Sequence, residues 1–189
     1  MNITRPLILA SKSPRRKQLL EQAGFDFTIQ TKDTPEDYAP TLPPEQVPLF
    51  LAEKKAMACQ SFLQDQEIII ASDTIVIQEG VIYEKPTDRA DAVRILQQLS
   101  GKMHQVITGV CLLSKEKKKC FSGQAKVYLE ELTAEEIDYY IDTYQPYDKA
   151  GAYAIQEWIG LCKILKIEGT YATIMGLPVH LVYQHLRDW

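Results

Sequence analysis

The sequence lacks any apolar run long enough to span a bilayer, and residues 1–6 do not lead into the apolar stretch of a secretory signal. These absences predict a cytoplasmic protein without membrane contact. Histidine is scarce, with three copies, and none of the four cysteines lies in a Cys-x-x-Cys pair. This spacing argues against a zinc site, and we expect reduced, buried thiols.

An excess of positive charge is also missing, because the net charge is −4 at neutral pH. A protein that binds nucleic acid usually presents a basic or aromatic-basic face, so this class is disfavoured. A small anionic ligand in a local basic pocket remains compatible with the composition. The 189 residues, 46% of them hydrophobic, predict one domain over residues 1–189, with two lobes possible around one core.

Alternation and residue type predict strands and helices that are interleaved along the chain. Strands are expected at residues 7–10, 25–30, 67–77, 105–114, 119–131 and 161–167. Helices are expected at residues 14–23, 45–63, 89–99, 134–143 and 177–187. Thr133 and Glu136 have the spacing of a capping box before the fourth helix. The pattern indicates an α/β protein with a mixed central sheet and flanking helices, and an exposed, functional loop at residues 31–44.

A cluster of cations follows the first strand, where Ser13 and Pro14 have the residue types of a helix start. Cations are unfavourable at this end of a helix, because the helix dipole is positive there. A bound phosphate would remove the conflict, since it would accept hydrogen bonds from free N–H groups and arginines. The alternative is a solvated basic patch on the surface.

Asp73 interrupts the apolar run at residues 68–77. A buried carboxylate is costly unless it is paired, so Asp73 is expected beside a cation or a metal, or at a strand end that opens into a cleft. In a phosphate site it would hold Mg²⁺ or activate water, whereas the simpler alternative is a structural turn cap. Pro86 ends the following hairpin and leaves Lys85 at an exposed tip, where plain solvation is the alternative role.

Eight short motifs follow one another in the order seen in Maf proteins. They are residues 10–16 (ASKSPRR), 72–74 (SDT), 84–86 (EKP), 99–101 (LSG), 108–110 (TGV), 148–153 (DKAGAY), 155–156 (IQ) and 176–178 (GLP). The chain therefore resembles the Maf family over nearly its whole length. The resemblance implies an elongated, two-lobed fold similar to that of inosine triphosphate pyrophosphatases, with a deep cleft. It also implies hydrolysis of a nucleoside triphosphate at the α-phosphorus, a divalent metal (Mg²⁺ or Mn²⁺) and a homodimer.

The same resemblance implies roles for individual residues. The phosphate-binding residues would be Ser11, Arg15, Arg16, Lys55 and Lys85. Glu36 and Asp73 would form the acidic pair that holds the metal, with Asp73 as the proton acceptor. The pattern Leu-Ala-x-x-Lys-Ala favours Lys55 over its neighbour Lys54.

Three positions resemble the dTTP/UTP branch of the family, namely Arg15, Thr74 and Gln156. A side-chain amide such as that of Gln156 can both donate to and accept from a pyrimidine edge. The 7-methyl-GTP branch resembles Pro-Trp-Arg and Ser-Asp-Gln at the first two positions. The sequence departs from the family pattern at residues 144–146 and 171–174, which affects the expected pocket rim. The alternatives are the same chemistry on CTP, 7-methyl-GTP or another nucleotide, or a nucleotide-sensing regulator of septation.

Overall fold

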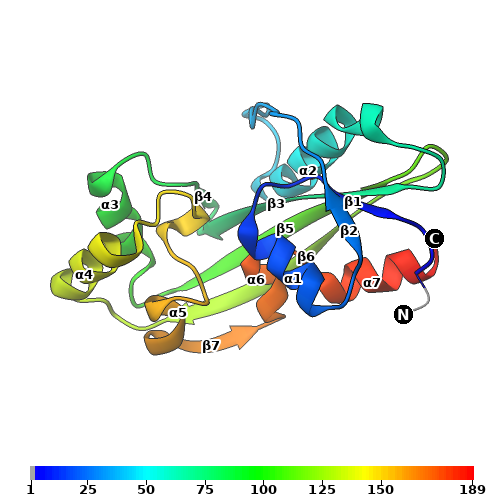
Figure 1. Ribbon diagram of the computed structural model, residues 1–189. Helices are drawn as coiled ribbons and strands as arrows, with labels where there is room; N and C mark the ends of the chain where they lie inside the picture. The colour runs from blue at the N-terminus through cyan, green and yellow to red at the C-terminus, as the bar shows by residue number, and fades with distance from the viewer. Residues whose placement is uncertain (1–2) are drawn as a thin grey trace. The chain divides into compact units, whose positions relative to one another are not determined.

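The computed structural model describes residues 3–189 and has a mixed α/β architecture, with a central sheet and flanking helices (Figure 1). Its strands are β1 (Leu7–Leu9), β2 (Phe27–Ile29), β3 (Ile68–Gln78), β4 (Val81–Tyr83), β5 (Met103–Leu113), β6 (Lys118–Leu129) and β7 (Ile164–Glu168). The sheet order is β2-β1-β3-β5-β6-β7, and β4 pairs with β3. β1 pairs in parallel with β2 and β3, whereas β3–β4 and β6–β7 are antiparallel, so the predicted mixed sheet is confirmed.

The chain divides into two compact units, and the boundary falls within β3, β5 and β6. The first unit contains the described residues up to Thr74, together with Thr108–Gly123 and Gly176–Trp189. The second contains Ile75–Ile107 and Gln124–Met175. The chain therefore passes from one unit to the other several times, and neither unit is a single stretch of sequence.

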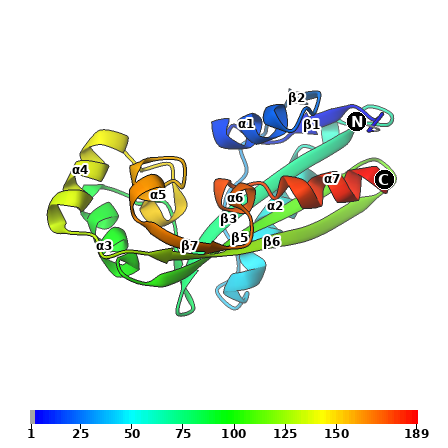
Figure 2. The same cartoon turned by 90° about the horizontal axis from the view of Figure 1, so that it is seen from below.

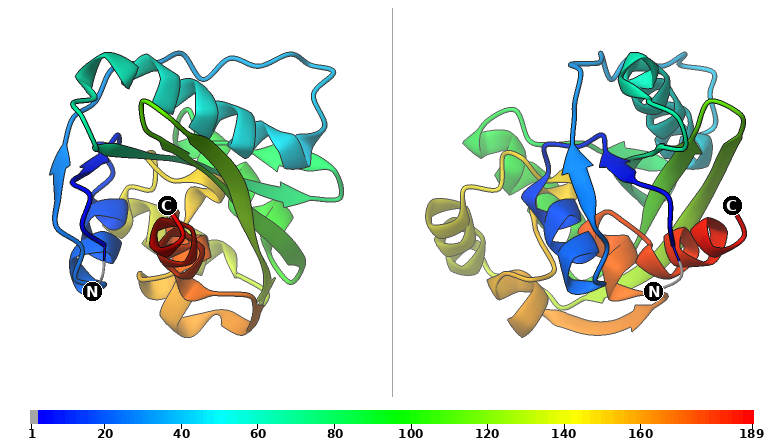
Figure 3. Two further views of the ribbon diagram at one scale, coloured as in Figure 1. Left: turned by 90° about the vertical axis from the view of Figure 1, so that its right-hand side faces the viewer. Right: turned by 45° about the vertical axis from the view of Figure 1, so that its right-hand side comes forward.

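In the first unit, helices lie on both faces of the sheet. α2 (Val47–Ala58) covers one face, and α7 (Val179–Arg187) lies on the opposite face (Figures 1 and 3). Small residues of α2 pack against the apolar side chains of β1, β3 and β5, forming one buried cluster. Gly109 allows this close approach, because a Cβ at that position would lie 2.3 Å from the Pro48 carbonyl oxygen. The packing fixes the height of α2 above the sheet and hence the place of its lysines.

The second unit has its own core, built by α3 (Arg89–Leu99) and α4 (Ala134–Tyr144) against the sheet (Figure 2). The expected capping box of α4 is present, since Thr133 and Glu136 satisfy each other's backbone N–H groups. Arg89 of α3 bridges Asp138 and Asp142 of α4. Two short helices, α5 (Trp158–Cys162) and α6 (Tyr171–Met175), follow.

Several predicted boundaries were wrong. The helix expected at residues 45–63 is α2 flanked by two 3₁₀ turns, Pro44–Gln46 and Gln60–Phe62. The last turn tightens because the Phe62 N–H bonds to the Cys59 carbonyl, three residues back. The strand expected at residues 161–167 begins at Ile164, since Leu161 and Cys162 belong to α5.

The cysteines are all free, as expected, but they are not all buried. Cys59 and Cys111 are buried, Cys120 is half-buried and Cys162 is exposed at the end of α5. Within residues 3–189, no helix has both the length and the apolar character needed to cross a membrane.

Candidate active site

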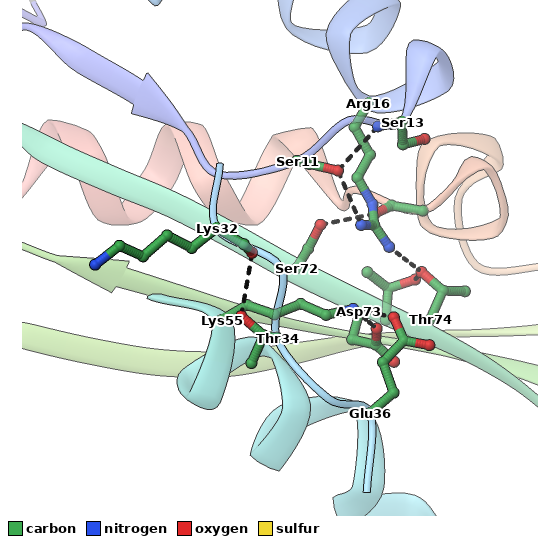
Figure 4. Close-up of polar contacts among 12 residues, drawn as sticks. Ser11, Ser13, Arg16, Lys32, Thr34, Glu36, Lys55, Ser72, Asp73 and Thr74 are labelled. Atoms are coloured by element: carbon green, nitrogen blue, oxygen red, sulfur yellow. Dashed lines mark hydrogen bonds and ion pairs between the residues drawn. The ribbon is translucent and has the colours of Figure 1, made fainter. Parts of the chain in front are cut away.

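The first unit brings the start of α1 (Pro14–Gln22) beside the middle of β3 (Figure 4). β1 ends at Leu9, and the chain turns through Ser11, whose hydroxyl accepts a hydrogen bond from the Ser13 N–H at 3.2 Å. Ser13 occupies the N-cap position and Pro14 the first turn, as predicted. Among the described residues, however, the Ser13 side chain caps no helical N–H group.

Arg16 makes three hydrogen bonds that join separate segments of the first unit. Its Nε donates to the Gly176 carbonyl at 3.0 Å, and its terminal nitrogens donate to Ser11 Oγ at 3.2 Å and Thr74 Oγ1 at 3.4 Å. Burial lowers the pKa of the guanidinium, and the nearby Asp73 carboxylate opposes that shift. Arginine remains charged under these conditions, so Arg16 is a fixed and poorly solvated cation.

Three contributors to this arrangement were not given a role from the sequence. Ser72 is fully buried and donates to the same Gly176 carbonyl at 3.2 Å, and Thr108 shares a 2.9 Å hydrogen bond with Thr74. Gly176 has a φ of +108°, which favours glycine. The motifs at residues 108–110 and 176–178 were the available signal, but they gave no indication of these partners.

Lys55, Asp73 and Glu36 meet at one point of the first unit (Figure 4). Lys55 projects from α2 and bonds to the Asp73 carboxylate on β3, and it bonds to Glu36 Oε1 at 2.7 Å. Asp73 is 7% exposed, so the expected pairing of this buried carboxylate with a cation is present. The arrangement holds two carboxylates and one ammonium in a partly buried setting.

The loop that carries Glu36 is tied to lysines along its length. Asp33 pairs with Lys12 at 2.7 Å, and Asp37 pairs with Lys54 at 2.7 Å. Lys54 therefore faces the loop, whereas Lys55 reaches Asp73. That Lys55 rather than Lys54 binds phosphate stays a prediction.

The Asp73 and Glu36 donor set fits a hard divalent cation. Both carboxylates converge on one cationic atom, Lys55 Nζ, and are therefore close enough to share a charge between them. Magnesium is commonly held by one or two carboxylates plus the phosphates of its substrate. Within residues 3–189 there is no group of three or more His, Cys, Asp or Glu side chains that could hold a metal. Water and substrate oxygens are the further ligands that magnesium takes at such a site.

The remaining predicted residues are placed as follows. Arg15 is half-buried on α1, next to Arg16. Lys85 is exposed after β4, as expected, and Gln156 lies just before α5, with both residues in the second unit. The first unit contains the other seven predicted site residues, which are Ser11, Arg15, Arg16, Glu36, Lys55, Asp73 and Thr74. That Lys85 and Gln156 act together with these seven, across a cleft, remains a prediction.

The chain is similar to known proteins over nearly its whole length. A family model described as Maf-like protein matches residues 6–189. A protein of Porphyromonas gingivalis named dTTP/UTP pyrophosphatase is 48% identical over 188 residues, covering 97% of this chain and 94% of its own. A Bacteroides fragilis protein of the same name is 48% identical over 183 residues, covering 96% and 95%. One from Christiangramia forsetii is 43% identical over 182 residues, covering 96% and 93%.

Proposed function

This chain belongs to the Maf-like protein family, and we propose that it hydrolyses dTTP and UTP to the nucleoside monophosphate and pyrophosphate. The observation that carries the proposal is the meeting of Lys55, Asp73 and Glu36 near the half-buried guanidinium of Arg16. Relatives that share nearly the full length are named for this activity. A polyanion site with an ionised carboxylate at its centre is what such chemistry requires.

The cations would bind and neutralise the triphosphate. Arg16 is held rigidly by its bonds to the Gly176 carbonyl and two hydroxyls, so its charge is positioned before the substrate arrives. Arg15 and Ser11 flank it, and Lys55 and Lys85 would bind further phosphate oxygens. Because the cations are already in place, the protein does not have to reorganise its charges during the reaction, and the activation free energy is lower.

Asp73 would act on the attacking water. Its carboxylate accepts a proton from the water as the oxygen attacks the α-phosphorus, and the bond from that phosphorus to the bridging oxygen breaks, releasing pyrophosphate. Asp73 and Glu36 would hold Mg²⁺ or Mn²⁺, which when bound supplies further charge neutralisation on the phosphate oxygens. Lys55 donates hydrogen bonds to both carboxylates and would hold Asp73 and Glu36 near each other.

Base choice would depend on Arg15, Thr74 and Gln156. Thr74 is hydrogen-bonded to Thr108 and Arg16, which fixes the position of its hydroxyl on β3.

We also propose that the enzyme works in the cytoplasm as a homodimer. Light scattering on the purified protein tests the oligomeric state, and a monomer at micromolar concentration would exclude the homodimer.

A nucleotide panel tests the function. Purified protein with Mg²⁺ is incubated with dTTP, UTP, CTP and 7-methyl-GTP, and pyrophosphate and orthophosphate are measured separately. We expect pyrophosphate, with dTTP and UTP turned over fastest. Faster turnover of CTP or 7-methyl-GTP would make that nucleotide the substrate in place of dTTP and UTP. Nucleotide binding without hydrolysis would instead support a sensor.

A further inference from the structure

Gln156 carries an unsatisfied hydrogen-bond acceptor in the second unit. Its amide oxygen is buried, and within residues 3–189 it has no hydrogen-bond partner. A buried acceptor left unpaired destabilises the folded protein, because the acceptor has lost its hydrogen bonds to water. The unpaired amide oxygen does not stabilise the fold. We therefore infer that its hydrogen-bond donor belongs to a ligand.

The backbone on both sides of Gln156 is tied to one hydroxyl. Tyr140 of α4 is fully buried, and its hydroxyl accepts a hydrogen bond from the Ala154 N–H at 3.0 Å. The same hydroxyl donates to the Glu157 carboxylate. Ala154 precedes Gln156 by two residues and Glu157 follows it directly, so a single atom restrains both flanks.

Two further contacts stiffen the same segment. Lys149 is buried, and its ammonium lies 3.4 Å from the Glu157 carboxylate, so this ion pair restrains the orientation of the carboxylate. Gly160 of α5 lies so close to Ile155 that a Cβ there would be 1.8 Å from the Ile155 carbonyl oxygen. Residues 154–157 therefore have little freedom to move the Gln156 amide.

We propose that Tyr140 is a positioning residue that sets base selectivity by fixing the Gln156 amide. This inference rests on the proposed function, because it takes Gln156 to contact the pyrimidine. An amide discriminates between bases only if its oxygen and nitrogen are held in register with the edge they contact. Tyr140 itself would not touch substrate.

The first test measures kcat/KM of Tyr140→Phe on dTTP and on CTP. We expect the dTTP-to-CTP ratio to fall about tenfold, which is the order of the net contribution of one hydrogen bond. The matched control is Tyr139→Phe, which removes a hydroxyl from the next residue of the same helix, where the ring is half-exposed and packs on Trp158. That variant should keep the wild-type ratio.

A double-mutant cycle separates positioning from stability. If Tyr140 acts through Gln156, Tyr140→Phe should change the ratio in the wild-type background but not in Gln156→Ala. Thermal unfolding is recorded for every variant. A Tyr140→Phe enzyme that is less stable yet keeps its ratio would show that the hydroxyl is only structural, and would overturn the inference.

Glu157 supplies a second route should Tyr140→Phe fail to fold. Glu157→Gln retains an acceptor for the Tyr140 hydroxyl and should keep most of the selectivity, whereas Glu157→Ala should lose it. Equal ratios in these two variants would reject the proposal. If the wild-type protein releases pyrophosphate from neither dTTP nor UTP, the proposed function is wrong and the inference falls with it; an active wild type with unchanged variants rejects the inference alone.

Discussion

At the scale of single residues, the site depends on a carboxylate placed inside an apolar strand. Asp73 is buried on β3 and satisfied by Lys55. Asp73→Asn keeps the size of the side chain and an oxygen that can accept from Lys55, but it removes the charge and the basicity. We expect turnover of dTTP to fall at least about 100-fold, the usual contribution of a general base. Steady-state pyrophosphate release measures the effect.

The matched control for that substitution is Asp65→Asn. Asp65 also pairs with a lysine, Lys115 at 2.6 Å, but its side chain is 91% exposed and lies outside the candidate site. This variant should retain wild-type turnover, because exposed ion pairs contribute little. Near-full activity of a well-folded Asp73→Asn protein would remove Asp73 from the mechanism.

Gly176 positions Arg16, and its replacement should lower activity. A Cβ at Gly176 would lie 3.3 Å from both Arg16 Nε and Thr74 Oγ1, and the residue has a positive φ. Gly176→Ala should therefore displace the guanidinium and reduce kcat/KM on the order of tenfold, as small misplacements at a phosphoryl site do. Kinetics on dTTP give the measurement.

Gly80→Ala controls for backbone strain alone. Gly80 has a φ of +80° and open space where a Cβ would lie. Both alanine variants should lose about 1 kcal/mol of stability from the left-handed backbone. Only Gly176→Ala should lose activity, and a similar kinetic loss in both would contradict the positioning role.

The residues that break a local rule were the ones predictable from the sequence. Asp73 stands out in an apolar run, and Arg15 and Arg16 stand out at a positive helix end, so each calls for a partner. The residues that contact them could not be predicted from the sequence. Ser72 and the Gly176 carbonyl are 104 residues apart in the chain, and no periodicity or spacing relates them.

At the scale of elements, end signals determined how well the boundaries could be predicted. Residues 89–99 form α3 as expected, because Asp88 caps the helix and a clear apolar stripe runs along it. The expected helix at residues 45–63 has no comparable stop signal after Ala58. Its last residues form a 3₁₀ turn instead. Short helices such as α5 and α6 span too few residues for a period to be recognised.

The capping box of α4 gives a prediction at this scale. Thr133 Oγ1 accepts from the Glu136 N–H at 3.2 Å, and Glu136 Oε2 accepts from the Thr133 N–H at 2.9 Å. Thr133→Ala should lower the free energy of unfolding by about 1 kcal/mol. Urea denaturation measures the change. Thr143→Ala, at an exposed position in the last turn of α4, should cost nothing; equal midpoints for the two variants would argue against the cap.

At the scale of the whole molecule, composition and residue pattern predicted the α/β fold class but not the order in which the strands pair. Interleaved strands and helices predict a mixed sheet, and the sheet is mixed. The order β2-β1-β3-β5-β6-β7 and the repeated passage of the chain between units depend on long-range pairing, which local pattern does not encode. Because neither unit is continuous in sequence, we expect the protein to unfold in one cooperative step.

That single unfolding step should depend on pH through His104. The ring is fully buried, with Nε2 2.7 Å from the Tyr153 hydroxyl, and burial lowers its pKa from 6.5 to about 4. Between these values the unfolded chain binds the proton and the folded protein does not, so stability is complete above pH 6.5 and falls as the pH drops. From pH 7.5 to 5 the loss should be about 2 kcal/mol, measured by urea unfolding. His104→Gln should abolish this slope, and the exposed-site control His180→Gln should keep it; an unchanged slope in His104→Gln would assign the acid sensitivity elsewhere.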